Sequence, residues 1–185
     1  MDIQDLKQKC KEYKENEGRE SFYDVAVNIV DDHPLQASII ILATWNSSRF
    51  RFFANNPQNL IDLKEAIEKT KPLFEKIKNK EFQTVNLDEI KDNIKEIYSI
   101  FSRVKGVEYT GASKVMHLIN RNLFIMWDGY IRKEYGLKNN DAEDYFNFLK
   151  LMQDKFSNIK WDIPEKSLTK AIDEYNYVIF TLPNL

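Results

Sequence analysis

Apolar residues recur at helical spacing along most of this 185-residue chain. Stripes with a period of about 3.6 residues occupy residues 22–29, 39–45, 60–67, 87–101, 112–119, 145–156 and 168–179. No stretch shows the strict alternation of apolar and polar positions that is typical of a half-buried strand. The pattern therefore predicts an all-α fold.

Prolines and serines mark where the predicted helices begin and end. Pro57 and Pro164 stand where the first turn of a helix accepts a proline, and Pro72 is expected to restart or kink the chain. Ser47 and Ser48 are expected to end the strongly apolar helix at 39–45. The following residues then form a connection before the helix that Pro57 opens.

The bulk composition allows one compact unit with an uneven distribution of charge. Residues 1–185 are expected to form a single helical domain, either undivided or as two packed lobes around a cleft. The net charge is −2, but residues 101–133 hold six Lys or Arg against two acids, so that window carries +4. A basic face on an acidic body suits docking of a polyanion, although a solvated helix face would have the same composition.

The cysteine count and the absence of long apolar runs limit the classes of protein. Cys10 is the only cysteine, so the sequence offers no disulfide and no thiolate set for zinc or an iron–sulfur cluster. We expect no metal and no cofactor. The start of the chain lacks the pattern of a signal peptide, and the longest apolar run is too short to span a bilayer. These features predict a cytoplasmic protein without a membrane partner.

Three of the five glycines lie in the stretch from 103 to 133. Gly106 and Gly111 bracket a predicted turn between two helices, and the first of them is expected to need a positive φ or a close approach of backbone. The amides at the start of the next helix would form an anion site, flanked by Lys105 and Lys114. The alternative is a tight helix–helix connection with solvated lysines.

A lone carboxylate follows at a fixed distance from this turn. In the segment "IMWDGYIRK", Asp128 stands where a short helix bearing Arg132 and Lys133 would begin. An aspartate at this position is a common helix N-cap, so a purely structural role is one interpretation. The other is a functional carboxylate next to the turn.

These two segments resemble a known family. "VKGVEYTGASKVMHL" is similar to the helix-hairpin-helix of the base-excision DNA glycosylases related to endonuclease III, whose hairpin reads roughly L-P-G-V-G-x-K-T-A. "MWDGYIRK" is similar to that family's V-D-T-H-(V/I)-x-R segment, and the 18 residues from Thr110 to Asp128 match its usual spacing. The motif lies within 104–133, and the whole helix-hairpin-helix is expected at about 90–120. A looser likeness in architecture covers 36–180, and the tail beyond Gly136 also resembles archaeal 8-oxoguanine glycosylases.

The resemblance implies an all-α glycosylase-like fold of two helical lobes with DNA in the cleft between them. It implies a DNA-repair hydrolase that excises a damaged or mismatched base from duplex DNA, with Asp128 as the catalytic carboxylate. It leaves open a monovalent ion at the hairpin, and we expect a monomer. The residues that the resemblance assigns to DNA binding are Lys105, Gly106, Val107, Gly111 and Arg132.

The sequence departs from the family pattern at two positions. The second hairpin glycine of the family is Glu108 here, which places a carboxylate near the expected phosphate. The lysine that bifunctional members use for a Schiff base corresponds to Thr110, which predicts a monofunctional enzyme that uses water. Lys114, one helical turn further, is either a catalytic amine or a residue that forms a salt bridge or a phosphate contact. His117 is expected to be a structural histidine between helices.

The remaining candidates concern recognition of the base. Trp45, Asn46 and Tyr175 are candidate substrate-binding residues, because aromatic faces stack on an extruded base and an amide reads its edge. Core packing is the competing interpretation for both aromatic residues. The aromatic residues at 50, 52 and 53, interleaved with two arginines, form either a wedge inserted into DNA or a packed connection.

Two other classes of function stay open at the level of sequence. A non-catalytic DNA-binding or protein-interaction module of the same fold would use Asp128 only as a helix cap. An acidic helical domain that does not touch DNA is the third class, and DNA binding that is insensitive to salt, or absent at low salt, would distinguish it.

Overall fold

The computed structural model describes residues 2–185, and within them the chain is helical without strands, as the periodicity predicts. The α-helices are α1 (Ile3–Asn16), α2 (Glu20–Ile29), α3 (Pro34–Trp45), α4 (Ser47–Ala54), α5 (Pro57–Ile77), α6 (Lys91–Ser102), α7 (Glu108–Ile119), α8 (Gly129–Glu134), α9 (Ala142–Phe156) and α10 (Leu168–Asn176). Shorter turns are the 3-10 helices Leu87–Ile90 and Leu182–Asn184 and the π-helix Tyr177–Thr181.

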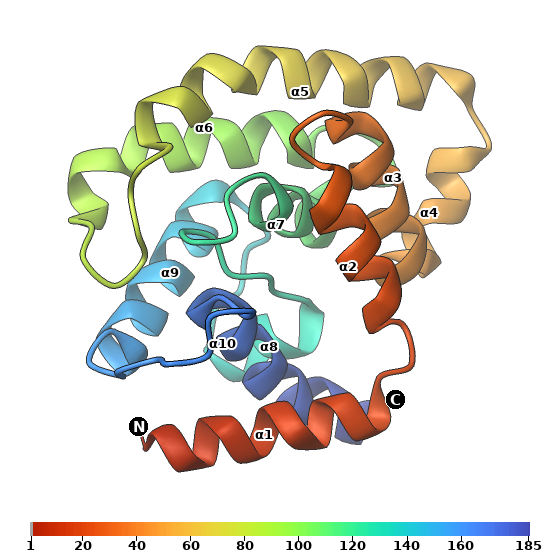
Figure 1. Cartoon of the computed structure of the whole chain (residues 1–185). Helices are drawn as coiled ribbons and strands as arrows, with labels where there is room; N and C mark the ends of the chain where they lie inside the picture. Colours follow the sequence, from red (N-terminus) through yellow and green to blue (C-terminus); the bar gives the residue numbers. More distant parts are fainter. Residues whose placement is uncertain (1) are drawn as a thin grey trace.

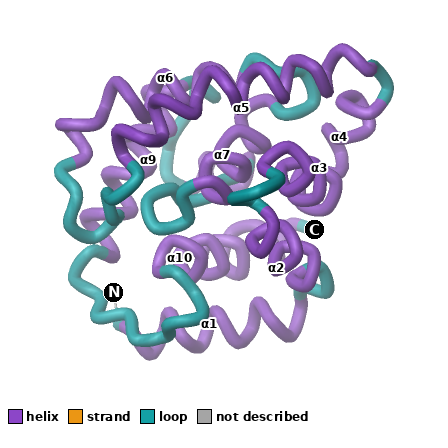
Figure 2. The backbone as a smooth tube through the Cα atoms, turned by 45° about the horizontal axis from the view of Figure 1, so that its top comes forward, coloured by secondary structure: helices purple, strands orange, loops and turns teal. Residues whose placement is uncertain are grey.

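Helix α7 is the centre of the molecule. Figures 1 and 2 show it surrounded by the other helices, with α5 and α6 on one side and α1 and α10 on the other. Helices α3 and α6 pack directly against it, and every residue from Gly111 to Leu118 is buried. Polar side chains on α7 must therefore find partners inside the protein or face an internal cavity.

A buried segment without regular structure, Leu123–Trp127, crosses the core after α7. Several of its backbone groups are paired by side chains, since buried peptide groups require partners. The His117 imidazole donates from Nδ1 to the Phe124 carbonyl at 2.7 Å, and the Tyr145 hydroxyl donates to the Ile125 carbonyl at 2.9 Å. The Trp127 amide donates to the Ser113 hydroxyl at 3.2 Å. These bonds fix the direction in which the chain reaches Asp128.

The hairpin, residues 103–107 between α6 and α7, depends on a glycine as expected. Gly106 has a φ of +83°, and a Cβ placed there would lie 2.5 Å from the Phe53 amide nitrogen. Both of the predicted reasons for glycine are therefore confirmed. Gly111 does not close the turn, because α7 already begins at Glu108; it lies in the first turn of α7, where a Cβ would meet Leu42 at 2.8 Å.

Several predicted helix boundaries differ in the structure. Pro57 is the first residue of α5 as expected, but α5 continues through Pro72 without a break. Ser47 opens α4 rather than ending a helix in a loop, so the aromatic stretch after it is helical. Pro164 lies before α10, which begins at Leu168 after a Ser167 N-cap. Helix α1 has no counterpart among the predicted elements. In the described residues, every helix is too short or too polar to cross a lipid bilayer.

The hairpin geometry predicts a specific loss of stability. Gly106→Ala should lower the free energy of unfolding by about 3 kcal/mol or more, because it combines a left-handed backbone with a clash against the Phe53 backbone. Urea unfolding measures the change.

Gly136→Ala is the matched control, because Gly136 has a φ of +71° but no atom within 4 Å of an added Cβ. It should cost only the backbone strain, about 1–2 kcal/mol. Equal losses for the two variants would contradict close packing of the hairpin against α4.

Candidate functional site

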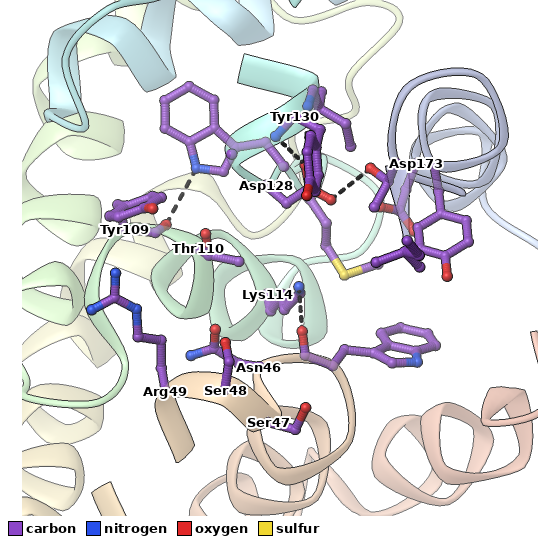
Figure 3. Close-up of a pocket in the computed structure, with 18 of the residues that line it drawn as sticks. Asn46, Ser47, Ser48, Arg49, Tyr109, Thr110, Lys114, Asp128, Tyr130 and Asp173 are labelled. Atoms are coloured by element: carbon purple, nitrogen blue, oxygen red, sulfur yellow. Dashed lines mark hydrogen bonds between the residues drawn. The ribbon is translucent and has the colours of Figure 1, made fainter. Parts of the chain in front are cut away.

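A cavity of about 560 Å³ opens between the first turns of α4, α7 and α8 and the C-terminal part of the chain. Its volume lies in the range of small-molecule sites, roughly 300–1,000 Å³. Figure 3 shows Thr110 and Lys114 along α7, with Asp128 on one side and Asn46 and Ser48 on the other. The cavity therefore brings together residues from distant parts of the chain, from Tyr13 to Leu185.

Asp128 forms the N-cap of α8 and also lines the cavity. Its Oδ1 accepts hydrogen bonds from the amides of Tyr130 at 2.8 Å and Ile131 at 2.9 Å. Its Oδ2 accepts a hydrogen bond from the Thr181 hydroxyl at 2.7 Å. These bonds hold the carboxylate in one orientation, and the second lone pair of Oδ2 stays available to a molecule in the cavity.

Lys114 lies in the wall of the cavity and is buried on α7. Its ammonium donates to the Trp45 carbonyl at 2.6 Å. Burial lowers the pKa of this amine, and the nearby carboxylates of Asp128 and Asp173 only partly offset that effect. The lysine is thus a buried amine shifted toward its neutral form, rather than a solvated surface charge.

The first turn of α7 contributes Tyr109 and Thr110 to the cavity. Within residues 2–185 their backbone amides have no intramolecular acceptor, whereas the Val107 and Glu108 amides both bond to the Val104 carbonyl. Open donors at a helix start favour an anion or an electron-rich oxygen. The candidate anion site therefore lies at the first turn of α7 and not in residues 103–107, which connect α6 to α7.

Glu108 does not stand as an isolated negative charge at the hairpin. Its carboxylate forms an ion pair with Arg49 of α4 at 2.8 Å. Its φ is +52°, a left-handed conformation that ordinarily favours glycine. The backbone at Glu108 thus has a conformation typical of glycine, and Arg49 pairs with the negative charge of the Glu108 carboxylate.

No pattern in the sequence pointed to Asp173, which lines the same cavity from α10. Burial raises the pKa of its carboxyl group, although the ammonium of Lys170, 3.2 Å away, acts in the opposite direction. Lys170 is itself fully buried, 4.3 Å from the ring centre of Tyr13 and 4.9 Å from that of Trp45. A helical pair of Lys and Asp three positions apart resembles an ordinary surface ion pair, so only the burial reveals this group.

Two of the three predicted base-binding residues line the cavity. Trp45 is among the lining residues, and its ring stacks on that of Tyr23 with centroids 5.3 Å apart. Asn46 also lines it, but its amide donates to the carbonyls of Gly106 at 3.1 Å and Val107 at 3.2 Å. Tyr175 lies elsewhere, in edge contact with Phe156, so its assignment to the base pocket does not fit the geometry.

The residues predicted to contact DNA are not all exposed. Lys105 is exposed, whereas Gly106, Val107 and Gly111 are buried between α3, α4 and α7. Arg132 donates to the carbonyls of Leu137 at 3.0 Å and Asn139 at 3.4 Å, so it fixes the loop after α8. Of this set, Lys105 alone offers its side chain freely to a partner.

His117 is a structural residue, as expected. It is buried, with Nδ1 bonded to the Phe124 carbonyl and Nε2 at 2.9 Å from the Tyr23 hydroxyl, so a neutral ring satisfies both partners. Burial lowers the pKa of His117 to about 3. This ring holds the segment that leads to Asp128 and does not exchange protons near neutral pH.

Residues 2–185 contain no group of three His, Cys, Asp or Glu side chains placed to hold a metal ion. No family model, curated protein or solved structure matches the chain. The function is therefore inferred from the geometry of the cavity.

Proposed function

We propose that this protein is a helix-hairpin-helix DNA glycosylase that removes a damaged or mismatched base from duplex DNA by hydrolysis. The observation that carries the proposal is the position of Asp128 and Thr110, which line one cavity of a size suited to an extruded base. In this proposal the helices form two lobes, and DNA lies across the mouth of the cavity.

The shape of the hairpin supports the proposal independently of the cavity. The two positions at which the family pattern has glycine are Gly106 and Glu108, and both have a positive φ here. The glutamate thus departs from the pattern in chemistry but not in backbone conformation. Its ion pair with Arg49 also removes the repulsion that a free carboxylate would exert on a phosphate.

Asp128 supplies the chemistry in this proposal. As the glycosidic C–N bond breaks, its electron pair leaves with the base and positive charge develops on the sugar, which a fixed carboxylate stabilises. The oxygen of a water molecule forms the new C–O bond, and Asp128 accepts a proton from that water. The hydrogen bonds from Thr181 and the α8 amides keep the carboxylate aimed without reorganisation.

Thr110 favours water as the nucleophile over an amine of the protein, because it stands at the position of the family's Schiff-base lysine. Lys114 lines the same cavity, and its amine is held in place by one hydrogen bond to the Trp45 carbonyl. In the proposed hydrolysis Lys114 orders the end of α3 and contributes a donor to the cavity wall.

A non-catalytic module of the same fold is the second candidate. The observation that favours it is that both carboxylate oxygens of Asp128 already have partners, as a simple helix cap would. Such a module would bind DNA through the hairpin but leave every base in place.

Substitution of Asp128 by Asn separates the two candidates. Asn is an equally good N-cap, and its amide can donate to the Thr181 hydroxyl, so the free energy of unfolding should change by less than about 1 kcal/mol. Excision should fall by about 100-fold or more, with DNA binding retained. The assay uses duplexes with 8-oxoguanine, uracil, hypoxanthine or an alkylated purine, followed by alkaline cleavage.

Asp141→Asn is the matched control, because Asp141 caps α9 through the Asp144 amide at 2.9 Å and does not line the cavity. It should leave excision unchanged. If the wild-type protein binds these duplexes but releases no base above the level of Asp128→Asn, the non-catalytic module is the correct function.

Borohydride trapping tests the choice of nucleophile. The hydrolytic mechanism predicts that wild-type protein forms no covalent adduct with a processed duplex under borohydride, because no imine is made. A trapped adduct that disappears in Lys114→Met would show that the buried amine attacks the sugar, and the water mechanism would be wrong.

A further inference from the structure

Helix α2 exposes the apolar stripe that its sequence pattern marks. Phe22, Val25 and Ile29 follow one another at intervals of three and four residues, so they lie on one side of the helix. Such a stripe ordinarily faces the core. In the structure Phe22 is 54% exposed and Val25 is 49% exposed, and Ile29 is half-buried. We call these three residues the α2 stripe.

A different face of α2 joins the core. Tyr23, Ala26 and Val30 are buried, and the Tyr23 ring stacks on the Trp45 ring with centroids 5.3 Å apart. Helix α2 packs against α3, and Figure 1 shows α2 on the near side of the molecule. Because this second face already attaches α2 to the fold, the two exposed members of the α2 stripe are not needed for folding.

The neighbouring helix α3 carries no charge. Residues 34–45 contain no Asp, Glu, Lys or Arg, yet Gln36 and Ala43 are exposed and Ile39 and Ile40 are only half-buried. A helix at the surface ordinarily has charged residues on its solvent face. A partner that approaches α2 therefore does not bury an unpaired charge on α3, which would be costly.

The free charges near the α2 stripe are acidic. Residues 20–48 contain four Asp or Glu and no Lys or Arg, although 27 of the 185 residues in the chain are Lys or Arg. Asp24 is exposed on α2, and Asp31 and Asp32 are exposed in the turn that follows it. This surface is complementary to an apolar stripe that is flanked by bases.

Two cations near the start of α2 are already paired. Arg19 forms an ion pair with Glu17 at 2.5 Å. Lys166 pairs with Glu174 at 2.6 Å and also lies 3.7 Å from Glu20. These two cations therefore do not neutralise the exposed aspartates of α2 and of the turn after it.

Other exposed apolar residues lack this combination of spacing and charge. Leu60 and Ile61 are consecutive on α5, so their side chains do not share a helix face. Leu151 on α9 directly follows Lys150. The α2 stripe combines helical spacing, exposure and acidic surroundings.

We propose that the α2 stripe is a docking site for an amphipathic helix of a partner protein, whose apolar face is flanked by Lys or Arg. Phe22 and Val25 make the apolar contacts, and Asp24, Asp31 and Asp32 pair with the flanking bases. A second copy of this chain is disfavoured as the occupant, because two α2 helices would bring their aspartates together. The inference goes beyond the proposed function and does not depend on it.

Fluorescence anisotropy with labelled synthetic peptides tests the docking site. The probe is a helix of about four turns, ~14 residues, with Leu along one face and Lys elsewhere. One control peptide has the same composition in scrambled order, and the other has Glu in place of Lys. The wild-type protein should bind the probe at least about tenfold more tightly than it binds either control peptide.

A double variant locates the binding on α2. Phe22→Ala combined with Val25→Ala should weaken binding of the probe by about tenfold or more, because it removes the apolar anchors. Leu151→Ala is the matched control, because Leu151 is 41% exposed on another helix, and it should bind as the wild type does. Thermal unfolding of the double variant should change little, since both side chains are exposed.

The salt dependence of binding tests the role of charge. Asp24→Asn should weaken binding of the probe at low salt and reduce the loss of affinity as salt rises, because it removes one carboxylate from the rim of the site. Unchanged affinity and salt dependence in this variant would contradict the assignment of the aspartates.

Three results would overturn the inference. The wild-type protein could bind the probe no better than the scrambled peptide, or the double variant could bind it as tightly as the wild type. Analytical ultracentrifugation could also show a wild-type dimer that the double variant dissociates, and the occupant would then be a second copy. None of these results bears on base excision, so the inference and the proposed function can fail separately.

Discussion

The structure depends on the joint at which the end of α3 meets the hairpin. The Asn46 amide donates to the buried Gly106 carbonyl, which has no other partner in the described residues, and shares the Val107 carbonyl with the Gly111 amide. The same chain reversal directs the Trp45 carbonyl to Lys114 and starts α4 against the hairpin. Without this joint, the part of the cavity wall that runs from Trp45 to Arg49 would have no defined shape.

A second set of hydrogen bonds, between α7 and the segment Leu123–Trp127, fixes the position of Asp128. Helix α7 is buried along its length, and its polar residues Ser113 and His117 pair with the segment Leu123–Trp127. The amides of Leu123 and Phe124 bond to the Asn120 carbonyl, and beyond them side chains hold the backbone of the segment in place. It delivers Asp128 to the start of α8, where Thr181 fixes the carboxylate from the C-terminal end of the chain. The candidate site thus depends on polar contacts inside the core.

The helical class and the importance of Gly106 could be predicted from the sequence. The spacing of apolar residues indicates helices, and a glycine in a short turn indicates a special backbone conformation. The sequence did not predict α1 or α4, and it placed Ser47 at a helix end, since a serine suits the start of a helix as well as its end. It named Tyr175 as a base-pocket candidate, with core packing as the alternative, and it overlooked Asp173, two residues before it on α10. Which of these two side chains lines the cavity depends on how α10 packs against its neighbours, and no local pattern in the sequence records that packing.

The central claim is that Asp128 faces a deoxyribose bound in the cavity. A crystal structure of Asp128→Asn with a duplex containing a tetrahydrofuran abasic position tests this most directly. The account predicts that the abasic sugar lies in the cavity within hydrogen-bonding reach of residue 128, with the hairpin against the backbone of the same strand. DNA bound on another face, with the cavity empty, would contradict it.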